Sequence, residues 1–326
     1  MLADLALIGH GNVARRFVEM LEEHRGRLAR EHDLTWRIAG IATRRHGSCI
    51  LDPDGARHPV DASADVIAAL ARSTAPLRVV IETTTLDIAA GRPAIDHVVQ
   101  GLNLGCHVVT ANKGPVAFAY RTLADAAAAR GVSFLFEGAV MDGVPIFNLV
   151  RETMPGVTIR GCRGVVNSTT NHILTALEDG EEFDAALAHM QAEGIAEADP
   201  SLDVDGWDAA AKTAALANVL LDARITPHDV DRTGITRADA ARARTARERG
   251  HRLRLVIEAT ADGRATVRPQ ELPGDDLLAG LRGMANALIL DTDLLGRVAV
   301  SQMDGGLTQT AYALMSDLIT VRRRAR

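Results

Sequence analysis

The feature that most constrains the fold stands at the start of the chain. An apolar run, Leu5–Ile8, leads into the glycine-rich turn G-H-G-N-V-A, and apolar side chains at helical spacing follow it. A strand, a tight glycine turn and a helix are the parts of a dinucleotide site. Gly9 permits the turn, Gly11 lets a pyrophosphate approach the backbone, and the helix start at Asn12 and Val13 presents free N–H groups. The turn therefore predicts cofactor binding; the alternative is an ordinary tight turn between a strand and a helix.

Beyond this turn, strand-like runs alternate with helical patterns. We expect strands at Arg78–Glu82, His107–Thr110 and Ser133–Glu137, and helices between them at Asp87–Leu104 and Phe118–Ala129. Short strands that alternate with helices are typical of a parallel sheet covered on both faces. The expected fold class is therefore α/β, a Rossmann-like doubly wound parallel sheet followed by an α+β part.

Polar residues stand at the carboxyl ends of these strands, where such sheets bind their ligands. Thr84 follows the first of them, and Lys113 follows the second. The ammonium of Lys113 is thus placed to meet a nicotinamide, a phosphate or a substrate carboxylate. Its alternative role is to cap the preceding turn.

The end of the second strand bears on which cofactor is bound. The apolar run Trp36–Ala42 is followed by Arg44 and Arg45, and no acidic residue stands there. An acid at this place favours the free 2′-hydroxyl of NAD, whereas arginine accommodates the 2′-phosphate of NADP. The pattern favours NADP over NAD; the alternative is a solvated basic turn.

A cluster of acidic residues precedes the second lysine of interest. Asp208 and Lys212 are four positions apart in D-A-A-A-K, so both should project from one helix face behind a loop at 197–206. A lysine among acids can exchange a proton, while the carboxylates can hold an ammonium-bearing substrate. The alternative is an acidic surface loop with one exposed ion pair. The acids are Glu193, Glu197, Asp199, Asp203, Asp205 and Asp208.

The second half of the chain has a different pattern. A strand at Arg160–Val166 leads into the polar run Asn167–Asn171, which either caps a helix beginning near His172 or binds a ligand. Asp262-Gly263 marks a hairpin between Leu253–Ala259 and Ala265–Arg268. A further strand is expected at Val298–Ser301, and a final helix at about 310–321.

Composition narrows the possible functions. The 326 residues, 47% of them apolar, are enough for two domains with buried cores, and the net charge of −6 argues against nucleic acid or an anionic membrane as partner. No apolar run reaches the roughly 18–20 residues that span a bilayer. Three widely spaced cysteines (Cys49, Cys106 and Cys162) indicate a reduced, cytoplasmic protein without disulfides. We expect each of them to be a small buried or half-buried residue rather than a nucleophile.

Four motifs, in this order, resemble those of the homoserine dehydrogenase family. They are T-A-N-K-G-P at 110–115, N-S-T-T-N at 167–171, G-I-A-E-A-D-P at 194–200 and D-V-D-G-W-D-A-A-A-K at 203–212. The likeness covers essentially the whole chain and implies the short form, without a regulatory domain or a fused kinase. It also implies the family reaction, in which NAD(P) interconverts aspartate 4-semialdehyde and homoserine on the route to threonine, methionine and isoleucine.

The resemblance implies a role for each acidic residue and lysine. Lys212 matches the acid that protonates the aldehyde oxygen as hydride arrives. Glu197 and Asp208 match the residues that bind the substrate amino group, and Asp203 matches another acid of that site. Lys113 matches a lysine near the nicotinamide and the substrate.

The resemblance also implies the organisation of the chain. Gly194 and Gly306 match glycines whose backbone lies near the cofactor. Residues 1–138, completed by a C-terminal helix at 307–326, should bind the dinucleotide. Residues 139–306 should bind the substrate and form a homodimer.

One segment departs from the family pattern. Family members carry a glycine-rich V-G-G-G-type turn whose main-chain oxygens hold a sodium ion, whereas Met141 and Asp142 replace glycines here. Carbonyl donors do not depend on the side chain, so the ion could be kept. The implied ligands are the main-chain oxygens of Glu137, Val140, Asp142 and Val144.

Two other functions are compatible with parts of the sequence. Met141 and Asp142 motivate the first, a paralogous NAD(P)-dependent dehydrogenase that acts on another small amino- or hydroxy-aldehyde. The second is a regulatory protein that senses NAD(P); loss of the lysines or the acids would favour it, and both are intact.

Overall fold

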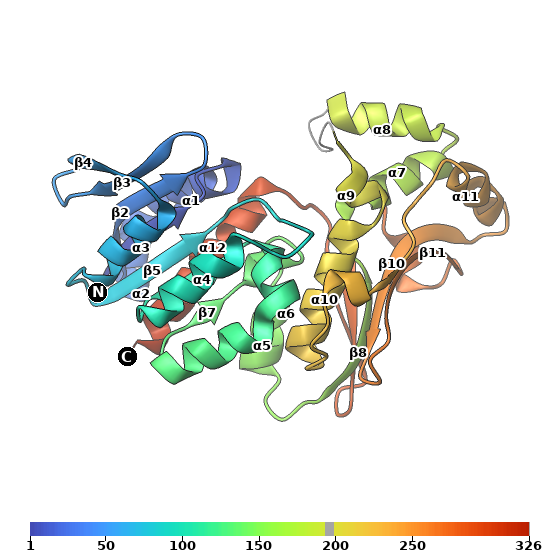
Figure 1. Cartoon of the computed structure of the whole chain (residues 1–326). Helices are drawn as coiled ribbons and strands as arrows, with labels where there is room; N and C mark the ends of the chain where they lie inside the picture. Colours follow the sequence, from blue (N-terminus) through green and yellow to red (C-terminus); the bar gives the residue numbers. More distant parts are fainter. Residues whose placement is uncertain (193–198, 326) are drawn as a thin grey trace. The chain divides into compact units, whose positions relative to one another are not determined.

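The first part of the chain forms a seven-stranded sheet of order β4-β3-β2-β1-β5-β6-β7 (Figure 1). The computed structural model describes residues 1–192 and 199–325. Five neighbouring strands are parallel, which confirms the predicted Rossmann-like sheet, while β3 and β4 extend one edge as antiparallel strands. The strands are β1 Leu2–Ile8, β2 Thr35–Thr43, β3 Gly47–Leu51, β4 Arg57–Val60, β5 Leu77–Glu82, β6 His107–Thr110 and β7 Phe134–Leu135.

Helices cover both faces of this sheet (Figure 1). Alternate strand residues such as Leu5 and Val79 join a core with α1, α2 and α12. Val80 points to the other face, where α4 packs so closely that a Cβ on Gly101 would lie 3.1 Å from the Val80 side chain. The helices are α1 Asn12–Glu23, α2 Arg25–His32, α3 Ser63–Ala71, α4 Ala94–Asn103, α5 Lys113–Arg130, α6 Ile146–Asn148 and α12 Leu307–Arg324.

Three predicted elements of this part have different bounds. The helix predicted at Phe118–Ala129 is α5, which begins earlier, at Lys113, where Asn112 caps it. The helix predicted at Asp87–Leu104 begins only at Ala94, because Gly91 has φ +70°, which is not helical, and Pro93 then stands at the N-cap. The strand predicted at Ser133–Glu137 shortens to β7, and a 3-10 turn takes over at Glu137–Ala139.

The rest of the chain forms a six-stranded sheet of order β13-β12-β8-β10-β11-β9. All of its neighbouring strands are antiparallel except β9 and β11. The predicted hairpin is the β10–β11 pair, and the predicted strands at 160–166 and 298–301 are β8 and β13. The strands are β8 Ile159–Val165, β9 Asp231–Arg232, β10 Arg252–Thr260, β11 Ala265–Leu272, β12 Asn286–Thr292 and β13 Arg297–Gln302.

Helices α7, α10 and α11 pack against this sheet. The helix predicted near His172 begins earlier, at Ser168, because Asn167 caps it. The segment predicted as a loop at 197–206 contains a short helix, α9. The helices are α7 Ser168–Glu178, α8 Phe183–Ala192, α9 Ser201–Val204, α10 Trp207–Leu220 and α11 Asp239–Glu248, with 3-10 turns at Pro227–Asp229 and Leu277–Gly280.

The chain therefore divides into two compact units. One comprises Met1–Asn148 with Gly306–Arg326, and the other comprises Leu149–Gly305. The boundary predicted after residue 138 lies ten residues before the division after Asn148. That cofactor binding belongs to residues up to 138 and substrate binding to those from 139 stays a prediction.

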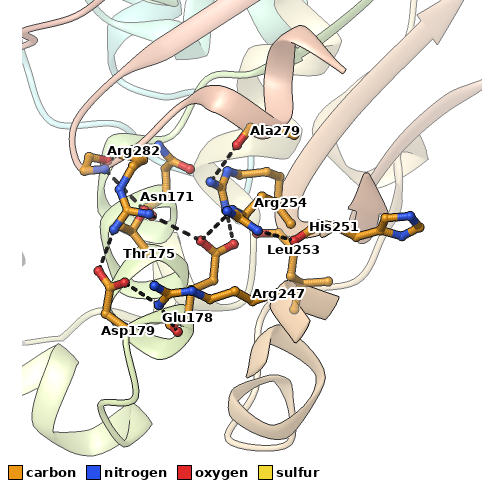
Figure 2. Close-up of polar contacts among 12 residues, drawn as sticks. Asn171, Thr175, Glu178, Asp179, Arg247, His251, Leu253, Arg254, Ala279 and Arg282 are labelled. Atoms are coloured by element: carbon orange, nitrogen blue, oxygen red, sulfur yellow. Dashed lines mark hydrogen bonds and ion pairs between the residues drawn. The ribbon is translucent and has the colours of Figure 1, made fainter. Parts of the chain in front are cut away.

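A buried ion pair connects helix α7 to strand β10 in the second unit. Figure 2 shows Arg254 and Glu178 pointing toward each other, and both side chains are 0% exposed. Arg254 Nη1 donates to Glu178 Oε1 at 2.5 Å, and Nη2 donates to the Ala279 carbonyl at 2.9 Å. Glu178 Oε2 lies 3.7 Å from Arg252 and 4.0 Å from Arg282. Burial lowers the pKa of Arg254, and the Glu178 charge opposes this effect.

Candidate active site

The glycine turn after β1 has the geometry of an anion site. Gly9 has φ +89°, and a Cβ there would lie 2.7 Å from the Thr83 carbonyl carbon, so only glycine fits. A Cβ on Gly11 would meet nothing within 4 Å, which leaves the backbone open to a ligand. Within the described part of the chain, no side chain caps the first turn of α1 at Asn12 and no acid stands in it. The helix can therefore offer its N–H groups, Val13 included, to a phosphate.

Positive charge collects near this turn. The pKa of the His10 imidazole is lowered, first by burial and then by Arg15 and Arg57. Positive charge at a helix N-terminus adds to the attraction for phosphate oxygens.

The loops after β5 and β6 are tied together by a buried carboxylate that the sequence analysis missed. Glu82 is 0% exposed; its Oε1 accepts the Thr84 N–H at 2.9 Å, and its Oε2 accepts the Thr110 hydroxyl at 2.8 Å. Asn112 donates from Nδ2 to the Thr84 carbonyl at 3.0 Å and caps α5 through Oδ1. Thr84 is thereby held beside the start of α5, where Lys113 stands. The available signal was an acid at the end of the apolar run V-V-I-E.

Arg44 and Arg45 lie in the exposed turn between β2 and β3. Its backbone is held by the His46 N–H, which donates to Thr43 Oγ1 at 2.8 Å. Among the described residues, neither arginine has an ion-pair partner. Both guanidinium groups can therefore reach an added anion.

In the second unit, Lys212 lies in a partly buried polar cluster rather than on the surface. Its Nζ is 3.0 Å from Asp208 Oδ2 and donates to the Val166 carbonyl at 2.5 Å. The two side chains are only 14% and 15% exposed, which rules out the exposed ion pair considered above. An ammonium has three N–H groups, and no third partner of Lys212 exists among the described residues. The group can donate its remaining hydrogen to a ligand.

Asn167 connects the acids of this cluster. Its Nδ2 donates to Asp203 Oδ1 at 2.7 Å and to Asp208 Oδ2 at 2.8 Å. Asp203 comes from α9, Asp208 from α10 and Asn167 from the N-cap of α7, which follows β8. The structure therefore brings Asp203, Asp208 and Lys212 into one cluster, and it adds Asn167, which the sequence marked only as part of a polar run.

The turn between α9 and α10, at Asp205 and Gly206, is held in place by contacts with residues 232–235. Gly206 has φ +80°, and the Arg232 guanidinium carbon lies 3.7 Å from the centre of the Trp207 ring. Arg232 also donates to the Asp205 carbonyl. The Ile235 N–H donates to the Val204 carbonyl at 2.8 Å. These contacts set where α10, and with it Asp208, begins.

The segment at 137–144 is held by carboxylates. Asp142 has φ +47°, and its side chain accepts the Thr310 hydroxyl at 2.9 Å and the Gly306 N–H at 3.1 Å. Glu137 Oε1 accepts the Phe147 N–H at 2.8 Å. Among the residues that the structure describes, no group of three or more His, Cys, Asp or Glu side chains could hold a metal ion.

The remaining sequence predictions concern Gly194, Glu197 and the cysteines. Gly194 and Glu197 lie outside the described residues. Cys106 and Cys162 are buried, and burial raises the pKa of their thiols to about 11 and about 12. Protonated thiols are poor nucleophiles, in agreement with their predicted structural role.

Comparison with known families decides the assignment. One family model, described as the NAD-binding domain of homoserine dehydrogenase, matches residues 9–137, and the homoserine dehydrogenase model matches residues 145–319. The chain belongs to the homoserine dehydrogenase family. It is an NAD(P)-dependent oxidoreductase, and the predicted family, enzyme class and fold are confirmed.

Several homoserine dehydrogenases are similar along almost their full length. The NAD(+)-dependent enzyme of Pseudomonas canavaninivorans is 36% identical over 98% of this chain and 96% of its own. The Sulfurisphaera tokodaii homoserine dehydrogenase is 33% identical over 98% of both chains. A putative homoserine dehydrogenase structure from Archaeoglobus fulgidus has a TM-score of 0.86 at 28% identity and covers 98% of this chain and 99% of its own.

A hyperthermophilic archaeal homoserine dehydrogenase solved with NADPH has a TM-score of 0.81 at 27% identity, over 98% of both chains. None of these similarities supports the alternative aldehyde substrate. No described helix combines the length and apolar character that crossing a membrane requires.

Proposed function

We propose that the enzyme interconverts L-aspartate 4-semialdehyde and L-homoserine and that Lys212 is its proton donor and acceptor. The nicotinamide, when bound, supplies or accepts the hydride at the carbonyl carbon. As that carbon gains the hydride, its oxygen gains negative charge, and Lys212 Nζ gives it a proton. In the reverse direction the neutral amine removes the hydroxyl proton. The observation that carries this proposal is the partly buried ammonium, paired with Asp208 and bonded to Val166, with donor capacity left over.

The carboxylates provide the other half of substrate recognition. Asp203 and Asp208 both accept hydrogen bonds from the Asn167 amide, so their two carboxylates lie close together. Two neighbouring negative charges suit the α-ammonium of an amino acid. By family resemblance we add Glu197 to this site and place Lys113 near the nicotinamide and the substrate. Asp208 Oδ2 lies 3.0 Å from Lys212 Nζ and so helps to fix the position of the amino group.

For the cofactor, we assign the pyrophosphate to the turn around Gly9 and Gly11 and to the helix start at Asn12 and Val13. The open backbone at Gly11 supports this assignment. Thr84 and Lys113 are assigned to the nicotinamide side. Gly194 and Gly306 complete the set by resemblance to the family.

NADP is proposed as the preferred cofactor, because Arg44 and Arg45 are exposed and without ion-pair partners among the described residues. Arg44→Ala with Arg45→Ala should raise KM for NADP by about 10–100-fold, the effect of losing charge-assisted hydrogen bonds, and change KM for NAD far less. Steady-state kinetics with both cofactors measures this. The matched control is Arg27→Ala with Arg30→Ala, which removes the same charge from exposed positions of α2. An unchanged ratio of NADP to NAD efficiency would contradict the assignment.

A sodium ion is proposed at the main-chain oxygens of Glu137, Val140, Asp142 and Val144. Hard carbonyl donors suit this ion, and the Asp142 carboxylate adds negative charge to the same turn. Exchange of sodium for tetramethylammonium at constant ionic strength should lower the melting temperature, because a bound ion stabilises the native state. An unchanged melting temperature would remove the ion from the proposal.

The assembly and location complete the proposal. A homodimer is supported by the edge strand β13 of the second sheet, which pairs on one side only with strands of the described residues, and by exposed apolar side chains at Leu294 and Met303. Light scattering at micromolar protein distinguishes a dimer from a monomer. Three free cysteines accord with the cytoplasm as the compartment.

A further inference from the structure

Asn167 uses the full hydrogen-bonding capacity of its side chain. The amide is 5% exposed; Nδ2 donates to Asp203 and Asp208, while Oδ1 accepts the Thr170 N–H at 2.8 Å and the Thr170 hydroxyl at 2.9 Å. Two donors and two acceptor positions are all that a carboxamide has. The reversed orientation would set Oδ1 against two carboxylates and an N–H against an N–H donor. The orientation of the amide is therefore determined by its surroundings.

The same short segment also holds the lysine. Val166, the residue before Asn167, accepts from Lys212 Nζ through its carbonyl at 2.5 Å. Asp208 Oδ2 receives Asn167 Nδ2 at 2.8 Å and lies 3.0 Å from Lys212 Nζ. A displaced Asn167 would thus change both the spacing of the two acids and the contact of Asp208 with the lysine.

We infer that Asn167 is a positioning residue, which joins Asp203 and Asp208 into one ammonium-binding site and holds Asp208 against Lys212. This inference rests on the proposed function, because it gives the acids their substrate. Two carboxylates that converge on one point repel each other. The amide N–H groups offset the repulsion and keep both acids as acceptors that face the same ligand.

Helix capping alone does not account for this arrangement. Capping of α7 uses only Oδ1, and serine or aspartate serves as well as asparagine at that position. The two donor contacts contribute nothing to the cap. A substitution that keeps the acceptor and removes the donor therefore separates the two roles.

The experiment compares Asn167→Ser and Asn167→Asp in the full chain. Both can cap α7, neither can donate to two acids, and Asn167→Asp adds a third negative charge. Asn167→Ser should raise KM for L-homoserine by about 10–100-fold, the effect of losing hydrogen bonds to charged groups. KM for NADP should stay within about twofold, because the cofactor turn belongs to other elements. Asn167→Asp should lose more of kcat/KM, since like charges repel.

The matched control is Asn218, whose amide is also 5% exposed and makes two hydrogen bonds of 2.8 Å to Ile225. Asn218→Ser should lower the melting temperature and leave KM for L-homoserine unchanged. A second readout is inhibition by L-2-aminobutyrate, which keeps the ammonium and lacks the hydroxyl. Its inhibition constant in Asn167→Ser should rise by the same factor as KM.

The outcomes separate two kinds of failure. If wild-type protein does not turn over L-homoserine, the proposed function and this inference both fall. If wild-type protein is active and Asn167→Ser keeps its KM for L-homoserine, the two donor contacts do not shape the substrate site, and Asn167 is only a helix cap. In that case the inference alone is overturned.

Discussion

Lys212→Ala is expected to lower kcat by about 10²–10⁴-fold, the usual cost of losing a general acid or base. KM for NADP should change little, because the assigned cofactor residues belong to other elements. Steady-state kinetics on aspartate 4-semialdehyde and on homoserine measures both directions of the reaction. Retention of more than about a tenth of the wild-type rate, well short of that range, would make this lysine structural and the mechanism wrong.

Lys212→Arg is the matched variant for this test. Arginine keeps the positive charge beside Asp208 but does not release a proton near neutral pH. It should therefore keep much of the fold and lose turnover as the alanine variant does. The composition gives this comparison weight: of the 36 lysine and arginine residues, only Lys113 and Lys212 are lysines. Arginine carries positive charge everywhere else, so the two lysines occupy positions where we propose chemistry.

Arg254→Met is expected to lower the free energy of unfolding by about 3–5 kcal/mol, because it leaves the Glu178 carboxylate buried without its closest partner. Arg252 and Arg282 lie 3.7 Å and 4.0 Å from Glu178 Oε2 and offset part of the loss, which favours the lower end of the range. Denaturant unfolding of the full chain measures the change.

Two further variants make this prediction specific. Glu178→Leu combined with Arg254→Met should recover most of the lost stability, since no buried charge is then unpaired. Arg237→Met removes an arginine that is 76% exposed and paired with the exposed Asp184, and it should change stability by less than about 0.5 kcal/mol. A loss as small as this in Arg254→Met would show that the buried pair contributes little.

Local signals in the sequence predicted much of the fold. The strand, glycine turn and helix at the N-terminus depend on neighbouring residues only, and β1 and α1 lie where they were expected. Asp208 and Lys212 share a helix face because their separation alone places them there. The hairpin around Asp262-Gly263 followed from its turn residues in the same way.

Other elements left no such signal. The edge strands β3 and β4 are short and partly exposed, so apolar periodicity does not mark them. Strand β12, by contrast, lies between β8 and β13 in the second sheet, and its mostly buried apolar run was a signal for a strand that was not predicted. Helix α4 begins late because a turn with positive φ at Gly91 interrupts a run that reads as helical.

What the sequence determined by itself is the type of residue that stands at each strand end and helix start: glycines, arginines, the two lysines and the acids. Only the tertiary structure decided which of these meet. Asn167 contacts acids that lie 36 and 41 positions further along the chain, and Glu82 contacts a threonine 28 positions away. Such contacts arise when sheets and helices pack, because burial obliges each polar group to find a partner wherever the fold brings one close. The spacing of residues along the chain therefore does not predict which polar groups become hydrogen-bond partners.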